Sequence, residues 1–286
     1  MLELNEWVVI FLFLQFNSKK DYFVAKNLFF ISLFFFVLLQ SYCIAYDCPQ
    51  FYEPRQIGTV QNTNANEISG IAASRKNPDV FWVHNDHSSS TAPMIYAMTS
   101  SGKTLGTFRL NDAVKRDYED IAIGPGPVPG IDYIYVGDIG DNDSDYNSIN
   151  IYRVPEPFVD ANSYYNTVKL AGVDTITMNY PGGPRDAEIL MVDPDNADIY
   201  ILTKRLVPTQ VYKAAYPQST TKTTTLSLMT TIDISWFTGG DISPDGKNVI
   251  LTGYSQTFLW PILPGQQPWQ AFANQFCEVP TVSQPQ

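Results

Sequence analysis

Carboxylic acids recur at one point of a pattern that occurs four times along the chain. Each copy is a short alternating strand, a turn rich in Pro, Gly, Asp or Asn, and an aromatic-rich second strand. When the copies are aligned on an isoleucine of the first strand, the preceding residue is Gly70, Asp120, Glu188 or Asp241. Because the copies are equivalent, we expect the three acids to occupy one structural position and to face a common centre.

Carboxylates held close together repel one another unless protons or a cation neutralise them. A site made only of oxygen ligands favours Ca²⁺, which takes about six to eight of them, over Zn²⁺. The alternative is structural, in which the acids cap turns and hold neighbouring repeats together. The predicted Ca²⁺ ligands are Asp120, Asp138, Asp141, Glu188 and Asp241, with Asn85 and Asn142 as neutral carbonyl donors.

The second strand of each copy runs antiparallel to the first, so its end returns to the same face. If the chain is an enzyme, His84 or Glu119 is the expected base, while Lys204 and Arg205 hold an anionic group. A purely structural role for His84 is the alternative. The sequence has two histidines, which excludes a histidine-rich metal site. The residues expected at this mouth are Glu67, His84, Asn85, Asp86, Asp117, Glu119, Asp186, Lys204, Arg205 and Tyr254.

The repeats predict the fold that positions these residues. Hairpins are expected at 67–86, 118–142, 185–205 and 239–254, roughly 50 to 70 residues apart and each followed by a third strand. This spacing predicts an all-β chain, a β-propeller of about five blades with four recognisable repeats. A β-sandwich is the alternative, although it does not require the same hairpin to recur. Residues 175–180 and 226–234 are expected as outer strands, and 56–61 as a closing strand.

Several segments resemble known propellers. The segment SPDGKNVIL resembles the repeat of TolB-type propellers, and ISGIAASRKNPDVFWVHND, RDYEDIAIGPG and PRDAEILMVDP resemble a family of secreted, largely uncharacterised propellers. The resemblance covers residues 64–285. It implies the fold, and it implies a further hairpin after the last residues here, so that this chain lacks its last blade. Only at the level of fold does it extend to gluconolactonase, paraoxonase and phytase propellers, which hold Ca²⁺ in the channel.

The N-terminal residues 1–45 are expected to lie outside the propeller domain, which is 46–286. An apolar run at 27–39 follows three lysines, and Cys43 and Ala45 fit the small positions of a signal cleavage site. We predict a secreted protein, and the alternative is an uncleaved signal anchor that holds it on a membrane. Cys48 and Cys277 then remain as a pair in an oxidising compartment and are predicted to form a disulfide.

Charge and composition limit the partners. The chain of 286 residues has a formal net charge of −11, which argues against a nucleic-acid partner. Asn142 begins the sequon Asn-Asp-Ser and is a predicted glycosylation site. The expected function is a cation-binding recognition module for a small molecule, glycan or protein. The alternative is a calcium-dependent lactonase, esterase or phosphoester hydrolase that uses the same channel carboxylates.

Overall fold

The computed structural model describes residues 46–86 and 92–282. The described residues from Cys48 onward form one compact unit. The predicted signal or anchor segment at 1–45 lies outside the described residues. Among the residues that are described, no helix is long and apolar enough to cross a membrane.

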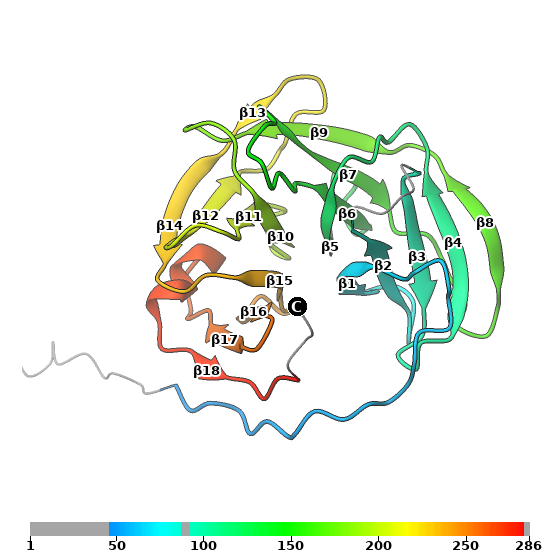
Figure 1. Cartoon of the computed structure of the whole chain (residues 1–286), viewed down its shortest axis with the longest axis horizontal. Coiled ribbons are helices and arrows are strands. Elements are labelled where there is room, and N and C mark those ends of the chain that lie inside the picture. The colour runs from blue at the N-terminus through cyan, green and yellow to red at the C-terminus, as the bar shows by residue number, and fades with distance from the viewer. Residues whose placement is uncertain (1–45, 87–91, 283–286) are drawn as a thin grey trace, which may run out of the picture. The chain divides into compact units, whose positions relative to one another are not determined.

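Four sheets surround a common centre, with the first strand of each sheet innermost (Figure 1). Within each sheet the first four strands from the centre outward pair antiparallel. We call the sheets blades 1 to 4 in chain order. Blade 1 contains β1 (Ile68–Ala73), β2 (Phe81–Asn85), β3 (Met94–Met98) and β4 (Thr104–Leu110). Blade 2 contains β5 (Tyr118–Pro125), β6 (Asp132–Asp138), β7 (Ile149–Pro155) and β9 (Asp174–Asn179). Blade 3 contains β10 (Ala187–Val192), β11 (Ile199–Thr203), β12 (Thr209–Ala214) and β14 (Ser227–Ile232). Blade 4 contains β15 (Phe237–Ile242), β16 (Asn248–Gly253), β17 (Thr257–Pro261) and β18 (Cys277–Glu278), with the 3₁₀ helix η1 (Pro268–Ala273) before β18.

Two connecting segments interlock neighbouring blades at their outer edges. The strand β8 (Tyr165–Leu170) leaves blade 2 and pairs in parallel with β4 of blade 1. The strand β13 (Thr224–Thr225) leaves blade 3 and pairs in parallel with β9 of blade 2. Each connection therefore covers an outer edge that would otherwise present unpaired backbone groups to solvent.

The apolar core lies between the blades. Trp82 and Phe108 of blade 1 pack in one cluster with Ile121 and Ile123 of blade 2, and two similar clusters fill the interfaces of blades 2 with 3 and 3 with 4. The inner strands of blades 2 and 3 are consequently buried on both faces, as in the sequence AEILMV of β10, in which every residue is buried. This is why such strands form continuous apolar runs in the sequence.

The structure confirms an all-β propeller and excludes the sandwich. The outer strands expected at 175–180 and 226–234 are β9 and β14. The described chain forms four blades, one for each of the four repeats recognised in the sequence. The segment 56–61, expected to close a last blade, instead donates backbone hydrogen bonds from Thr59 and Gln61 to Ser101 and Gly102, in the turn after β3.

Blades 4 and 1 meet less closely than the other neighbours. β1 packs on β5, β5 on β10 and β10 on β15, whereas β15 and β1 touch only sparsely. Ile71 on β1 faces this junction and is 56% exposed, while Ile121, the ladder counterpart on β5, is 2% exposed. The predicted disulfide between Cys48 and Cys277 is present and ties the N-terminal segment to β18. This segment therefore links blade 4 to blade 1 along the outside (Figure 1).

Candidate functional site

Every innermost strand contains a β-bulge near its start. The ladders to the second strands leave one residue of the first strand unpaired, and these residues are Ser69, Glu119, Glu188 and Thr238. A bulge redirects a side chain relative to the regular alternation of a strand. Residues of different blades are therefore structurally equivalent when they lie at the same distance from the bulge. In blades 2 and 3 the bulged residue is a glutamate.

The bulge corrects the alignment made from the sequence. Glu188 is itself the bulged residue, Asp120 follows its bulge by one position, and Asp241 follows its bulge by three. The three acids occupy different ladder positions, so the expectation that they share one position was wrong. The residue of blade 2 that is structurally equivalent to Glu188 is Glu119, which was expected from the sequence to act as a base at the mouth.

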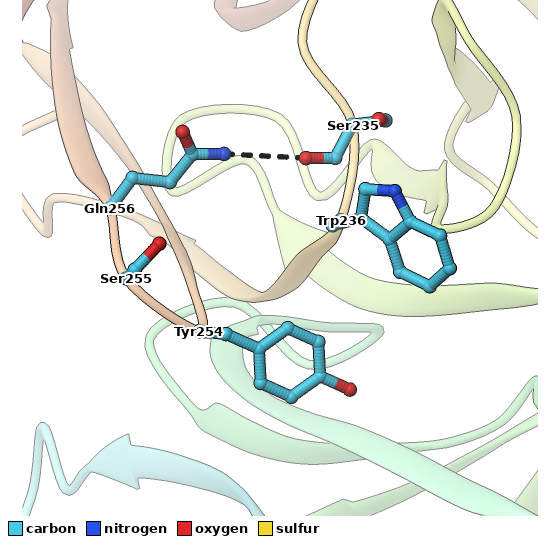
Figure 2. Close-up of a pocket in the computed structure, with 5 residues that line it drawn as sticks. All are labelled: Ser235, Trp236, Tyr254, Ser255 and Gln256. Atoms are coloured by element: carbon cyan, nitrogen blue, oxygen red, sulfur yellow. Dashed lines mark hydrogen bonds between the residues drawn. The ribbon is translucent and has the colours of Figure 1, made fainter. Parts of the chain in front are cut away.

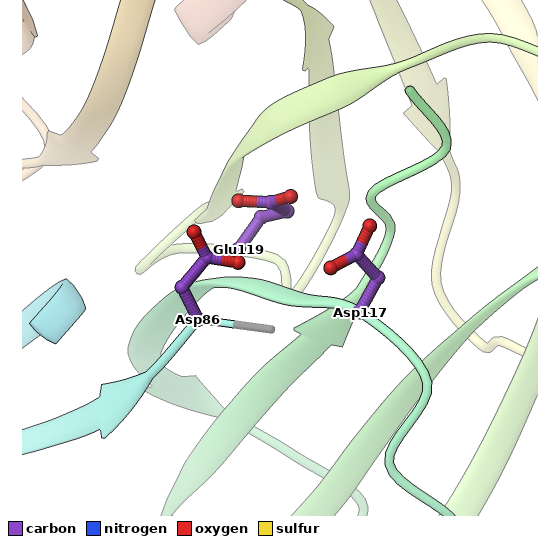
Figure 3. Close-up of side chains that lie close together, drawn as sticks. All are labelled: Asp86, Asp117 and Glu119. Atoms are coloured by element: carbon purple, nitrogen blue, oxygen red, sulfur yellow. The ribbon is translucent and has the colours of Figure 1, made fainter. Parts of the chain in front are cut away.

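Glu119 joins two groups of acids. Among the described residues, ligand atoms lie within 4.8 Å of one another in the group Asp86, Asp117 and Glu119, and in the group Glu119, Asp186 and Glu188. Figure 3 shows the first group, with its carboxylates directed toward one another. The side chain of Glu119 is 3% exposed, and no hydrogen bond or ion pair to it occurs in the described part of the chain. These five carboxylates are called the acidic centre below.

Gly140 makes room for the acidic centre. A Cβ atom at this position would lie 2.3 Å from Oε1 of Glu119 and 2.5 Å from Oδ2 of Asp117. Both distances are far below any van der Waals contact, so a side chain here would displace the carboxylates. The loop after β6 thus approaches the two acids as closely as a backbone without a side chain permits.

Three cations of the described chain offset part of the charge of the acidic centre. Lys204 forms an ion pair with Glu188, and Nε of Arg205 lies 2.7 Å from Oδ2 of Asp186. The ammonium group of Lys115 donates to the backbone carbonyl of Asp86 at 2.5 Å. Counted over the described residues, these five carboxylates and three cations leave a formal charge of −2, which equals the charge of one divalent cation in magnitude.

Burial of the acidic centre disfavours the ionised carboxylates. Burial raises the pKa of Glu119, and the nearby charges of Glu188, Asp86 and Asp117 raise it further. Burial also raises the pKa of Glu188, although its ion pair with Lys204 acts in the opposite direction. Without a cation, Glu119 therefore holds a proton more readily than an ordinary glutamate.

Asp120 and Asp241 belong to neither group. Asp120 accepts the backbone N–H of Ile121 with one oxygen and that of Leu190, on β10, with the other, each at 2.9 Å. It thereby joins the inner strands of blades 2 and 3. Asp241 accepts the N–H of Ile242 at 2.8 Å, and burial raises the pKa of Asp241 to about 6. Both residues match the structural alternative considered for the acids.

Asp138 and Asp141 also hold local backbone. Oδ1 of Asp138 accepts the N–H groups of Arg116 at 3.0 Å and of Asp117 at 2.6 Å, at the entry to β5. The two oxygens of Asp141 accept N–H groups within the loop after β6, one of them from Tyr146 at 2.9 Å. Their hydrogen bonds fix the loops that carry Asp117 and Gly140, so both aspartates lie behind the acidic centre and outside its two groups.

His84 and Asn85 lie in the wall of the mouth. His84 is fully buried, with its ring edge-on to Tyr118 at 5.9 Å and its Nδ1 3.1 Å from the carbonyl oxygen of Asn85. Its Nε2 has no hydrogen-bond partner among the described residues and lies 2.5 Å from where a Cβ of Gly70 would be, and burial lowers the pKa of His84 to about 4. The amide of Asn85 donates to the carbonyl of Asn64 at 2.7 Å, so it holds the chain that enters β1.

Two openings adjoin the acidic centre. A cavity of about 450 Å³ is lined by residues of all four blades and is bordered by Asp120, Glu188, Lys204, Asp241 and Tyr254, among others. A second pocket, of about 530 Å³, also has Tyr254 in its lining. The predicted ligand-binding residues Lys204 and Tyr254 are therefore adjacent, with the ammonium group 5.7 Å from the centre of the ring.

Arg205 connects the acidic centre to the predicted glycosylation site. Its guanidinium group donates to Oδ1 of Asn142, which is exposed, and also pairs with Asp186. An N-linked glycan would be attached through Nδ2 of Asn142 and leaves Oδ1 as an acceptor. Sequence analysis placed Asp117 and Asp186 at the mouth without making them ligands, although the spacing acid-x-Glu in 117–119 and 186–188 marks both pairs.

No protein-family model and no curated protein matches the sequence. Similar solved structures include the Dos1 propeller, at 15% identity with a TM-score of 0.35 over 70% of this chain and 46% of that one. A functionally unknown protein from Desulfotomaculum acetoxidans has 13% identity and a TM-score of 0.37 over 74% and 55% of the two chains. An auxiliary nutrient binding protein from Bacteroides thetaiotaomicron has 10% identity and a TM-score of 0.41 over 74% and 47%. The chain spans about half the length of these structures, and the TolB-type resemblance stays a prediction.

Proposed function

We propose that this chain is a secreted recognition module that binds a divalent cation, Ca²⁺, in its acidic centre and a ligand at the adjoining mouth. The observation that carries the proposal is Glu119, a buried carboxylate that accepts no hydrogen bond from any residue the structure describes and that is shared by both groups of acids. Burying a charge that has no partner is costly. A cation between the two groups would compensate that cost for several carboxylates at once.

The chemistry of the donors favours Ca²⁺ among the common ions. All donors of the acidic centre are carboxylate oxygens, which suit Ca²⁺ or Mg²⁺ rather than a metal that prefers sulfur or nitrogen. Mg²⁺ requires nearly octahedral geometry and retains its water, whereas Ca²⁺ accepts irregular sets of carboxylates. Secretion agrees with this choice, and the disulfide supports it because such bonds persist in oxidising compartments.

Thermal unfolding with and without Ca²⁺ tests the proposal. At a concentration of about 100 times the dissociation constant, a ligand that binds only the folded state adds about 2.7 kcal/mol. We expect Ca²⁺ to raise the melting temperature by several degrees, Mg²⁺ to raise it less, and Glu119→Gln to abolish the rise. Glu278→Gln removes the same charge from an exposed position on β18 and should keep it. A wild-type protein with no response to Ca²⁺ rejects the proposal.

The hydrolase alternative uses the same acids but is less well supported. Of its two expected bases, His84 is buried and has its Nε2 against the backbone at Gly70. Glu119 is then the remaining base, and it lies within the acidic centre that would hold the ion. A panel of lactones, aryl esters and phosphoesters, assayed with Ca²⁺, separates the two functions. Turnover that Glu119→Gln abolishes and Glu278→Gln retains would replace the recognition role by hydrolysis.

A further inference from the structure

A pocket of about 530 Å³ lies on blade 4, beside the acidic centre. Its lining comes from two short segments, one before β15 and the other between β16 and β17 (Figure 2). The two segments are joined by a hydrogen bond from Nε2 of Gln256 to the carbonyl of Ser235, at 3.3 Å. The lining residues are Ser235, Trp236, Tyr254, Ser255 and Gln256.

Trp236 is held at the surface in an uncommon conformation. Its backbone φ of 65° lies in the left-handed region, which bulky residues rarely adopt, and its side chain is 48% exposed. The N–H of Trp236 donates to the carbonyl of Lys204 at 3.2 Å, and a Cβ at Gly253 would lie 2.6 Å from the carbonyl oxygen of Trp236. Neighbouring backbone thus enforces a conformation that keeps the indole out of the core, and such enforced strain clusters at functional sites.

The chemistry of the lining identifies the class of ligand. Two aromatic rings, two serines and one glutamine form the pocket, and no charged side chain is among them. The indole N–H of Trp236 has no hydrogen bond within the described residues and is free to donate to a ligand. An aromatic face offers an apolar surface with negative charge above the ring, which attracts the C–H face of a sugar. Hydroxyl and amide groups around it match the hydroxyl groups at the edge of such a ring.

Trp236 is structurally equivalent to two residues of the acidic centre. Counted from the bulge, it occupies in blade 4 the place of Asp117 in blade 2 and Asp186 in blade 3. The guanidinium carbon of Arg205 lies 5.9 Å from the centre of its ring, and Arg205 also pairs with Asp186 of the acidic centre. The pocket and the acidic centre therefore adjoin on one mouth and share Arg205 as their boundary.

We propose that this pocket binds a neutral pyranose ring of a glycan, stacked on Trp236 and flanked by Tyr254. The inference deepens the proposed function and rests on its recognition role, because it names the class of ligand that the mouth takes. Trp236 supplies the apolar platform and an indole N–H donor. Ser235, Ser255 and Gln256 supply hydrogen bonds to ring hydroxyl groups.

Tryptophan fluorescence and calorimetry on the mature chain test this inference. The probes are maltohexaose, cellohexaose, laminarihexaose and chitohexaose, titrated in the presence of Ca²⁺. We expect at least one of them to shift the emission, and Trp236→Ala to weaken its binding at least tenfold. Trp236→Phe should retain part of the affinity, because it keeps an aromatic face. If Trp236→Ala does not fold, Trp236→Gly replaces it in the titrations, because glycine readily adopts the left-handed backbone at this position. The control is Tyr164→Ala, which removes an exposed aromatic side chain outside the pocket.

The outcomes separate this inference from the proposed function. A Ca²⁺-dependent rise in melting temperature without binding of any of the four probes, or with binding that Trp236→Ala leaves unchanged, overturns the saccharide inference alone. Saccharide binding that depends on Trp236 in a protein with no response to Ca²⁺ supports the inference and rejects the cation site. Binding that depends on Trp236, together with a Ca²⁺ response that depends on Glu119, supports both.

Discussion

Asp120 separates the structural role of a carboxylate from a role in cation binding. It is 3% exposed, and its two oxygens accept the N–H groups of Ile121 and Leu190. The Asp120→Ala substitution leaves both N–H groups without this acceptor, and each unsatisfied buried group costs about 1–3 kcal/mol. We therefore expect a loss of about 2–6 kcal/mol in the free energy of unfolding. Asp120→Asn retains one carbonyl oxygen, so about half of that loss is expected.

Denaturant unfolding measured with and without Ca²⁺ distinguishes the two roles. If Asp120 acts only by joining β5 to β10, Asp120→Ala unfolds at lower denaturant in both conditions and keeps the full increment from Ca²⁺. Glu119→Gln should behave in the opposite way and lose the increment. The reasoning is refuted if Asp120→Ala stays within about 0.5 kcal/mol of the wild type, which is the range of ordinary surface substitutions. It is equally refuted if this variant loses the Ca²⁺ increment.

Three further predictions concern pH, the disulfide and the loop beside the acids. Burial lowers the pKa of His84 to about 4 in the folded protein, against about 6.5 in the unfolded chain. Below pH 6.5 the unfolded chain therefore binds a proton that the folded protein does not, and the stability that neutral His84 contributes above pH 6.5 is lost as pH falls toward 4. Between pH 7 and 4.5 the wild type should lose about 2 kcal/mol more than His84→Asn in denaturant unfolding, and equal losses would contradict this. Replacing Cys48 and Cys277 by serine opens a loop of 229 residues and should cost up to about 5 kcal/mol, and an unchanged unfolding midpoint would count against it. Gly140→Ala places a Cβ 2.3 Å from Oε1 of Glu119 and should weaken Ca²⁺ binding about tenfold by calorimetry, whereas unaltered affinity would show that the acids are not held by this loop.

The blades could be predicted from the sequence because each one is a local unit. Hairpin strands alternate or run continuously apolar, and turns such as Pro-Asp-Gly at 244–246 mark their ends. The four hairpins are therefore present where they were expected. The number of blades depends instead on how distant segments pack. Residues 56–61 have the composition of a strand, but their backbone pairs with the turn at Ser101 and Gly102.

The acidic centre could be predicted only in part, because a bulge changes which residues are equivalent. Aligning Ile121 with Ile189 is natural when strands are treated as regular. Counted from the bulge, however, the structural equivalent of Ile121 in blade 3 is Leu190. One unpaired residue reverses the face of every side chain beyond it. Because of the bulge, Glu119 is the residue shared by both groups of acids, and Asp120 lies at the interface between blades 2 and 3.

The same bulge explains why the mouth is uneven. Blades 2 and 3 carry a glutamate at the bulge, whereas blades 1 and 4 carry Ser69 and Thr238. Negative charge is therefore concentrated on one side, and its neutralisation by Lys204 on blade 3 is incomplete. On blade 4 an aromatic residue, Trp236, takes the place that acids hold in the other blades. This separation of a charged side from an aromatic side is what the two proposals require, because the ion and the uncharged ring would then lie next to each other on one mouth.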